Sequence, residues 1–160
     1  MTPQAILEQT LADFVPSSDQ KAFGRKEAWV IHKGDGPFGA DCDDFALTLL
    51  WRLVGGDEAR FWEALSTGEA KIIHVLSDRG NDHVVLFVRY AGYVDNLKPA
   101  WRDDLGYEDR GTYSVKAIRQ KLAGKDVQAP DDAKKSRKML IVAGLIGAAA
   151  VMMMLGEFKL

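Results

Sequence analysis

The chain has one cysteine, Cys42, and it lies in an acidic turn that opens an apolar segment. The turn reads Gly39-Ala40-Asp41-Cys42-Asp43-Asp44-Phe45-Ala46-Leu47. Apolar residues follow at helical spacing, and Asp41 and Asp44 stand where an N-cap and its capping-box partner would stand, so we expect Cys42 to be the first residue of a helix. Backbone N–H groups at a helix start favour a thiolate, which is the form of cysteine that attacks a carbonyl carbon.

Three aspartates flank Cys42, and negative charge beside a sulfur raises the pKa of a thiol. A reactive Cys42 therefore needs a basic partner from another part of the chain. The alternative is that Cys42 is a small buried side chain without a chemical role.

The basic partner that the sequence favours is His83. It begins a run of β-branched and aromatic residues that predicts a strand, and a second short strand carrying Asp95 follows after a turn. An imidazole at the start of a strand can face a cleft, and a carboxylate on the returning strand can orient it. The other two histidines are His74, expected to be a packed or surface residue inside a strand, and His32, whose glycine-rich surroundings leave its role open.

The length of the hairpin loop decides whether Asp95 reaches His83. A two-residue loop, Ala91-Gly92, places Asp95 on the opposite face of the sheet from His83, and Asn96 then shares the face of the histidine. A three-residue loop, Tyr90-Ala91-Gly92, restores the shared face but leaves Asp95 four residues along the strand, roughly 13 Å from His83. Asp95 is the preferred orienting residue and Asn96 is the alternative.

Three motifs follow one another in the chain: Gly-Ala-Asp-Cys-Asp-Asp-Phe-Ala-Leu, His-Val-Val-Leu-Phe-Val and Val-Asp-Asn-Leu. In order and in local context they resemble the bacterial transglutaminase-like cysteine peptidases, whose motifs run close to G-D-C-E-D-Y-A, H-x-V-L-x-V and L-D-N-L. The resemblance covers roughly residues 20 to 105 and includes a tryptophan, Trp29, ahead of the cysteine loop. Ala40 departs from the family pattern as an extra residue before the cysteine.

The resemblance implies a papain/transglutaminase-like α+β core, in which a Cys-bearing helix packs on a small antiparallel sheet. It implies that Cys42 is the nucleophile, His83 the general base and then acid, and Asp95 the orienting residue, in acyl transfer through a thioester. The backbone N–H of Cys42 would be one oxyanion donor; no second donor is evident in the loop before the cysteine, and Trp29 is the candidate.

No cofactor is required by this chemistry, but some members of the family bind calcium through acidic residues that flank the cysteine. Asp41 and Asp43 stand at the matching positions, and carboxylate oxygens suit this cation. The alternative is that these two aspartates cap the helix and hold no metal.

The C-terminal stretch 139–156 carries no charge and, as a helix, spans roughly 27 Å, near the thickness of the hydrocarbon core of a bilayer. Lysines and arginine at 134–138 precede it, so the positive-inside rule predicts a membrane anchor with the N-terminal domain on the cytoplasmic side. The alternative is a buried hydrophobic helix in an oligomer or a virion, and small residues four apart could pack such helices together.

The length of 160 residues fits one domain with an appendage: a peptidase domain over 1–124, a polar and basic linker over 125–138 and the anchor over 139–156. Within the domain we expect residues 98–113 to form a long covering loop. The net charge of −2 argues against general binding of nucleic acid.

Three functions remain open from the sequence. The first is a membrane-anchored cysteine peptidase or amidase that cleaves a protein or a peptidoglycan stem peptide, with a phage or the membrane or interior of a virion as one setting. The second is a degenerate transglutaminase-like module that binds a partner without turnover. The third is a structural membrane or virion protein whose C-terminal helix is the functional part.

Overall fold

The computed structural model describes residues 1–18, 21 and 28–130, and a compact unit extends over Met1–Val127. The predicted membrane helix over 139–156, and the linker beyond residue 130, lie outside the described residues. None of the described helices combines the length and the apolar character that crossing a bilayer requires.

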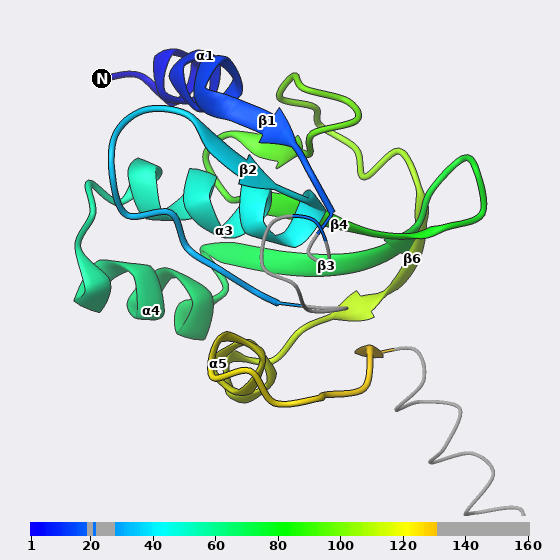
Figure 1. Cartoon of the computed structure of the whole chain (residues 1–160). Helices are drawn as coiled ribbons and strands as arrows, with labels where there is room; N and C mark the ends of the chain where they lie inside the picture. Colours follow the sequence, from blue (N-terminus) through cyan, green and yellow to red (C-terminus); the bar gives the residue numbers. More distant parts are fainter. Residues whose placement is uncertain (19–20, 22–27, 131–160) are drawn as a thin grey trace, which may run out of the picture. The chain divides into compact units, whose positions relative to one another are not determined.

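Helices and strands are mixed along the chain, as expected for an α+β protein (Figure 1). A four-stranded antiparallel sheet has the order β5-β4-β3-β6, and two short strands, β1 and β2, form a parallel pair. The described elements are α1 (Pro3–Asp13), β1 (Phe14–Pro16), β2 (Phe38–Ala40), α3 (Cys42–Leu53), α4 (Glu58–Thr67), β3 (Ala70–Leu76), β4 (Asp82–Val88), β5 (Gly92–Val94), β6 (Glu108–Thr112) and α5 (Val115–Leu122).

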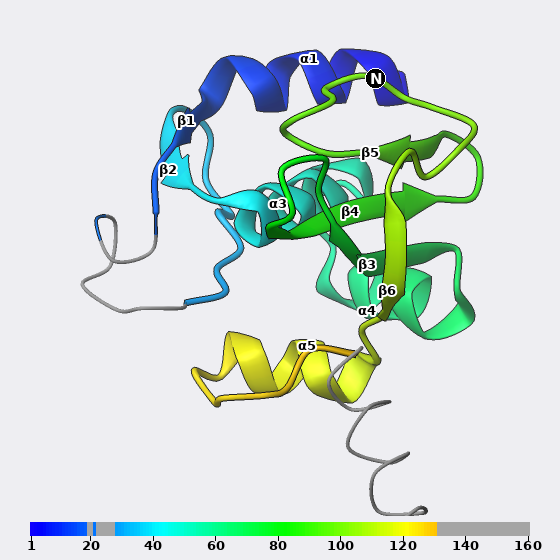
Figure 2. The same ribbon diagram turned by 90° about the vertical axis from the view of Figure 1, so that its right-hand side faces the viewer.

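Helix α3 is the centre of the core and packs against β4 (Figure 2). Phe45 and Leu49 of α3 are fully buried, and Leu86 of β4 belongs to the same apolar cluster. Burial of each such side chain contributes roughly 1.5 to 3 kcal/mol. Because side chains alternate along a strand, Val75 and Val85 point to the other face of the sheet and form a second, smaller cluster. The cysteine-bearing helix is thereby fixed on one face of the sheet.

The start of α3 agrees with the prediction in position but not in its hydrogen bonds. Cys42 is the first helical residue and Asp41 is the N-cap, yet the Asp41 side chain makes no capping hydrogen bond. Asp44 does not complete a capping box either, because its Oδ1 accepts a 2.6 Å hydrogen bond from the backbone N–H of Val30. The segment before the cysteine runs along α3, and its backbone at Val30 binds the Asp44 carboxylate that a capping box would have used.

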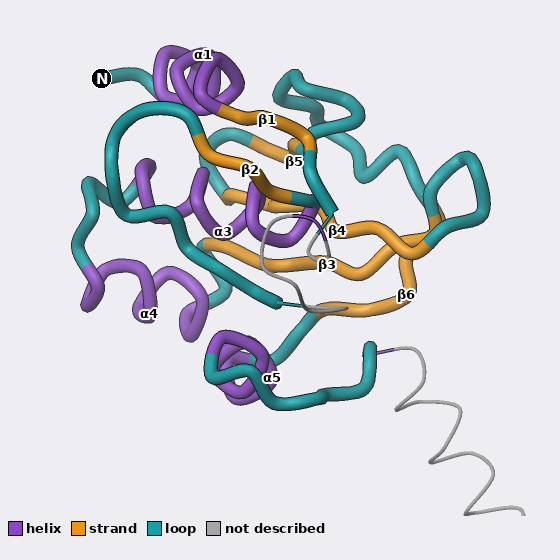
Figure 3. The backbone as a smooth tube through the Cα atoms, viewed as in Figure 1, coloured by secondary structure: helices purple, strands orange, loops and turns teal. Residues whose placement is uncertain are grey.

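The predicted covering loop over 98–113 contains a strand, β6, that pairs with β3 (Figure 3). The expectation of an irregular loop is therefore wrong for its second half. The strand has the polar sequence Glu-Asp-Arg-Gly-Thr and lies at the edge of the sheet, so it lacks the alternation of apolar and polar residues by which strands are recognised.

The hairpin between β4 and β5 has neither of the two predicted registers. Val88 pairs with Gly92, Phe87 with Tyr93 and Leu86 with Val94, so the loop is Arg89-Tyr90-Ala91. Continued by one residue, this register sets Asp95 across from Val85, on the face of His83 and about 7 Å along the strand from it. Both predicted loops included Gly92, whereas in the structure Gly92, at φ 97°, is already a paired residue of β5.

Candidate active site

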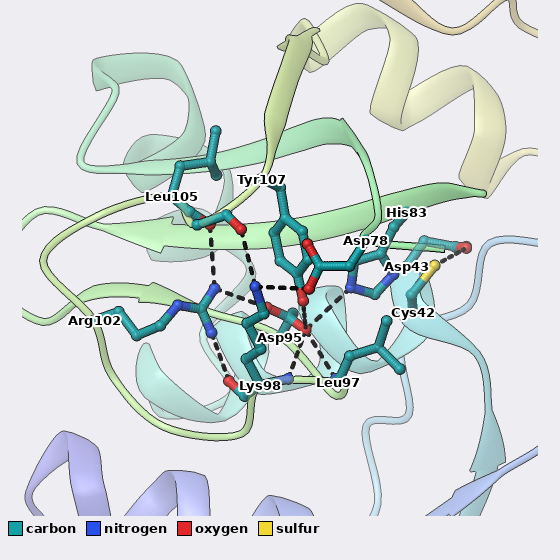
Figure 4. Close-up of polar contacts among 11 residues, drawn as sticks. Cys42, Asp43, Asp78, His83, Asp95, Leu97, Lys98, Arg102, Leu105 and Tyr107 are labelled. Carbon is teal, nitrogen blue, oxygen red and sulfur yellow. Dashed lines mark hydrogen bonds and ion pairs between the residues drawn. The ribbon is translucent and has the colours of Figure 1, made fainter. Parts of the chain in front are cut away.

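His83 and Asp95 form a buried pair at one end of the sheet (Figure 4). His83 is the second residue of β4, and Asp95 directly follows β5. The His83 Nε2 atom lies 3.1 Å from Asp95 Oδ1, with His83 5% exposed and Asp95 fully buried. Asp95, and not the alternative Asn96, therefore supplies the carboxylate oxygen next to the imidazole Nε2, and Nδ1 of His83 is left for another partner.

The two oxygens of Asp95 have different surroundings. Oδ1 also accepts hydrogen bonds from the backbone N–H groups of Leu97 at 2.8 Å and Lys98 at 2.9 Å, and from the Tyr107 hydroxyl at 3.3 Å. Oδ2 accepts a 2.8 Å hydrogen bond from the Arg102 guanidinium. Burial raises the pKa of Asp95, but the hydrogen bonds from His83, Arg102 and the backbone of Lys98 outweigh it and bring the pKa to about 2. Asp95 is therefore an anion at neutral pH.

Cys42 lies at the edge of β4 that β5 leaves open. The backbone groups of Asn81 and Arg89 bond to Ser77 and Glu69, which flank β3. Because these groups alternate along a strand, those of His83 also point to β3 and those of Val84 point the other way. Strand β5 pairs only as far as Leu86, which leaves the N–H of Val84 for the Cys42 sulfur. In Figure 4 the His83 ring lies between the Asp95 carboxylate and the Cys42 sulfur.

The surroundings of Cys42 disfavour its thiolate. Burial raises the pKa of the thiol far above its ordinary value, and the charges of Asp43 and Asp41 raise it further. The N–H groups of Val84 and of Cys42 itself lower the pKa, but by less. The Cys42 sulfur lies 4.0 Å from Asp43 Oδ1. Cys42 therefore rests as a thiol, as expected for a cysteine among aspartates.

Asp41, Cys42 and Asp43 bring their ligand atoms within 4.8 Å of one another, and this is the cluster at which the sequence suggested calcium. Calcium takes six to eight oxygen ligands, whereas this cluster offers two carboxylates and a sulfur. Asp41 and Asp43 would supply only part of such a ligand set and the sulfur does not suit calcium, so the calcium site at these two aspartates stays a prediction.

The other two histidines lie away from this constellation. His74 is buried inside β3, and its Nε2 lies 2.9 Å from Asp82 Oδ1, which makes a second histidine–aspartate pair. Its partner in the sheet is Val84, so its side chain shares the α3 face, opposite to that of His83. His32 stacks on Phe38 with ring centroids 4.8 Å apart.

Sequence reasoning did not find Arg102 and Tyr107, the two side chains that hold Asp95 from the segment after β5. Both fall in the part of the chain expected to form a covering loop, and no local pattern distinguishes this arginine from its neighbours. Arg102 can be recognised only from the folded chain, because its backbone pairs with that of Tyr93 in β5.

Comparison of the chain with models of protein families finds no match, and comparison with curated proteins finds none either. The three motifs and the positions of Cys42, His83 and Asp95 are therefore the features from which a function can be inferred.

Proposed function

We propose that this protein is a cysteine peptidase or amidase with a papain/transglutaminase-like core, in which Cys42 is the nucleophile, His83 the general base and Asp95 the orienting residue. The observation that carries the proposal is the buried His83–Asp95 pair together with Cys42 at the start of α3, whose sulfur is hydrogen-bonded to the backbone of Val84, the residue that follows His83 (Figure 4). A nucleophile, a base and a group that orients the base are the parts that acyl transfer through a cysteine requires.

In the proposed reaction Nδ1 of His83 takes the Cys42 proton as the sulfur attacks the carbonyl carbon of an amide. Because the thiol pKa is raised, this proton leaves during the attack and not before it. The imidazolium, stabilised through Nε2 by Asp95, then gives the proton to the leaving amine, and the C–N bond breaks to leave a thioester on Cys42. Water completes hydrolysis, or a second amine completes transamidation.

The negative charge on the attacked oxygen needs donors near the start of α3. The backbone N–H of Cys42 is one candidate. The Trp29 Nε1 atom is buried and has no hydrogen-bond partner among the described residues, which supports Trp29 as the second. An indole N–H can only donate, so an acceptor formed during the reaction would suit it.

We propose a peptide or isopeptide amide in a protein or in peptidoglycan as the substrate, with a phage or virion as one setting. Residues 139–156 are proposed to anchor the chain in a membrane, with the N-terminal domain on the cytoplasmic side or with the protein in a virion, and to allow helix-mediated oligomers. The anchor is tested by fractionation: the full chain is expected to sediment with membranes, and a 1–133 truncation that still does so would contradict the anchor.

The second candidate function is a transglutaminase-like module that binds a partner without turnover. The raised thiol pKa favours it, because a resting thiol is a weak nucleophile. A resting, unreactive thiol is also what we would expect of a structural membrane or virion protein.

Alkylation of Cys42 by iodoacetamide distinguishes the two candidates, because a chain with one cysteine gives a signal from one site. We expect His83→Asn to slow alkylation at pH 7 by about tenfold or more, since the loss of a general base removes factors of this size. His74→Asn is the matched control, because it breaks the other histidine–aspartate pair, in which the histidine is also buried, and its rate is expected to stay within about twofold of wild type. Equal rates for wild type and His83→Asn would refute the peptidase and support the binding module.

A further inference from the structure

Arg102 meets Asp95 at the oxygen that His83 does not use. Its Nη2 lies 2.8 Å from Asp95 Oδ2, and its side chain is 18% exposed. The same guanidinium donates from Nη1 to the Lys98 carbonyl at 2.7 Å and from Nη2 to the Leu105 carbonyl at 3.4 Å. Several bonds thus fix its plane, as Figure 4 shows, and its direction toward Asp95 is set by the surrounding backbone.

The backbone of Arg102 is held as firmly as its side chain. Tyr93 and Arg102 exchange two hydrogen bonds, of 2.8 and 2.9 Å. A Cβ atom on Gly92 would overlap the Arg102 carbonyl oxygen, so the close approach depends on a glycine at this position. The segment that carries Arg102 is therefore attached to the end of the hairpin that delivers Asp95.

Arg102 also supplies the charge that a buried carboxylate needs. Among the described residues, the ion-pair partners of Asp95 are His83 and Arg102, and of these two Arg102 is always charged. While His83 is neutral, the remaining donors to Asp95 are two backbone N–H groups and the Tyr107 hydroxyl. A fully buried carboxylate without a cation tends to take up a proton.

A protonated Asp95 would change the state of His83. An ionised carboxylate accepts a hydrogen bond and so favours the tautomer of His83 with the proton on Nε2, which leaves Nδ1 as an acceptor. A carboxylic acid can instead donate to Nε2, and the imidazole proton then moves to Nδ1. In that tautomer His83 could not take the proton of Cys42.

We propose that Arg102 is a positioning residue for the reaction: it holds Asp95 as an oriented anion and thereby keeps His83 in the tautomer whose Nδ1 can accept the Cys42 proton. This inference rests on the proposed function of Cys42 and His83. Its physical content, the control of the His83 tautomer by Arg102, can be measured without any turnover.

The test is long-range ¹H–¹⁵N correlation spectroscopy of the histidine rings in the ¹⁵N-labelled full-length protein at pH 8. Wild type is expected to show His83 with the proton on Nε2. Arg102→Gln is expected to shift the ratio of the two tautomers about tenfold toward the Nδ1 form, because charge-assisted hydrogen bonds contribute more than neutral ones. Arg102→Lys keeps the positive charge, so its tautomer ratio is expected to differ from that of wild type by no more than half of the Arg102→Gln shift on a logarithmic scale.

Arg52→Gln is the matched control, because Arg52 makes a comparable 2.7 Å ion pair with Asp13, with side chains 14% and 12% exposed. It is expected to leave His83 unchanged. Tyr107→Phe removes a neutral donor from Asp95 and keeps Arg102, so it should also preserve the Nε2 tautomer. This variant gives a second measurement if Arg102→Gln does not fold.

The proposal is overturned if Arg102→Gln folds and keeps the wild-type tautomer ratio, if Arg102→Lys is as altered as Arg102→Gln, or if Tyr107→Phe alone moves the proton to Nδ1. A changed tautomer together with unchanged alkylation in His83→Asn would instead refute the proposed function and leave only the control of the His83 tautomer by Arg102.

Discussion

The charge of Asp43 beside Cys42 provides the sharpest test of the electrostatics at the site. Asp43 is nearly buried, and its Oδ1 lies 4.0 Å from the sulfur. At this distance a carboxylate opposes a thiolate by about 1 kcal/mol in water and by about 4 kcal/mol at an effective dielectric constant of about 20. Asp43→Asn removes this repulsion, so it should raise the thiolate population at a fixed pH by about 5-fold to about 900-fold.

The rate of alkylation should rise by less than the thiolate population, because a thiolate of lower pKa is a weaker nucleophile. With about half of the gain lost on a logarithmic scale, we expect iodoacetamide to react about twofold to about 30-fold faster with Asp43→Asn than with wild type at pH 7. Intact-mass spectrometry follows the single label, and far-ultraviolet circular dichroism checks the fold.

Asp57→Asn is the control for Asp43→Asn, because Asp57 is the N-cap of the neighbouring helix α4 and is not among the charges that raise the pKa of the thiol. Its alkylation rate should equal that of wild type. A rate for folded Asp43→Asn that is equal to or below the wild-type rate would refute the reasoning that the acidic turn suppresses the thiolate.

Two further predictions concern stability. The pKa of Asp95 is lowered from 3.8 to about 2, so its ionised form contributes about 2 kcal/mol above pH 4, and this is lost as the pH falls from about 4 to 2. Urea unfolding should show this loss in wild type and not in Asp95→Asn; parallel pH profiles would contradict it. Gly92→Ala should lower the free energy of unfolding by more than the roughly 1 to 3 kcal/mol of a strained backbone, because its Cβ also overlaps the Arg102 carbonyl. Gly80→Ala, with a φ of 76° and open space around it, should lose the strain alone, and equal losses in both variants would exclude the overlap.

The sequence was sufficient where a feature depends on neighbouring residues. The helix beginning at Cys42 and the strand carrying His83 follow from the spacing of apolar residues, which each element requires to bury one face. The expected capping box failed for the opposite reason, because Asp44 bonds to Val30, fourteen residues earlier in the chain. Local spacing cannot report a competitor that is brought in by tertiary packing.

The amino-acid sequence by itself determined which groups the chain has for chemistry, namely one thiol among aspartates, a histidine at the start of a strand and an aspartate on the strand that returns. The tertiary structure alone decided that His83 and Asp95 meet, because the register depends on Gly92 pairing within the strand against the backbone of Arg102. It also decided that Asp95 is charged, since the cation beside its second oxygen comes from a segment with no recognisable pattern. Backbone register and buried charge both depend on contacts between residues distant in the sequence, and local patterns do not encode such contacts.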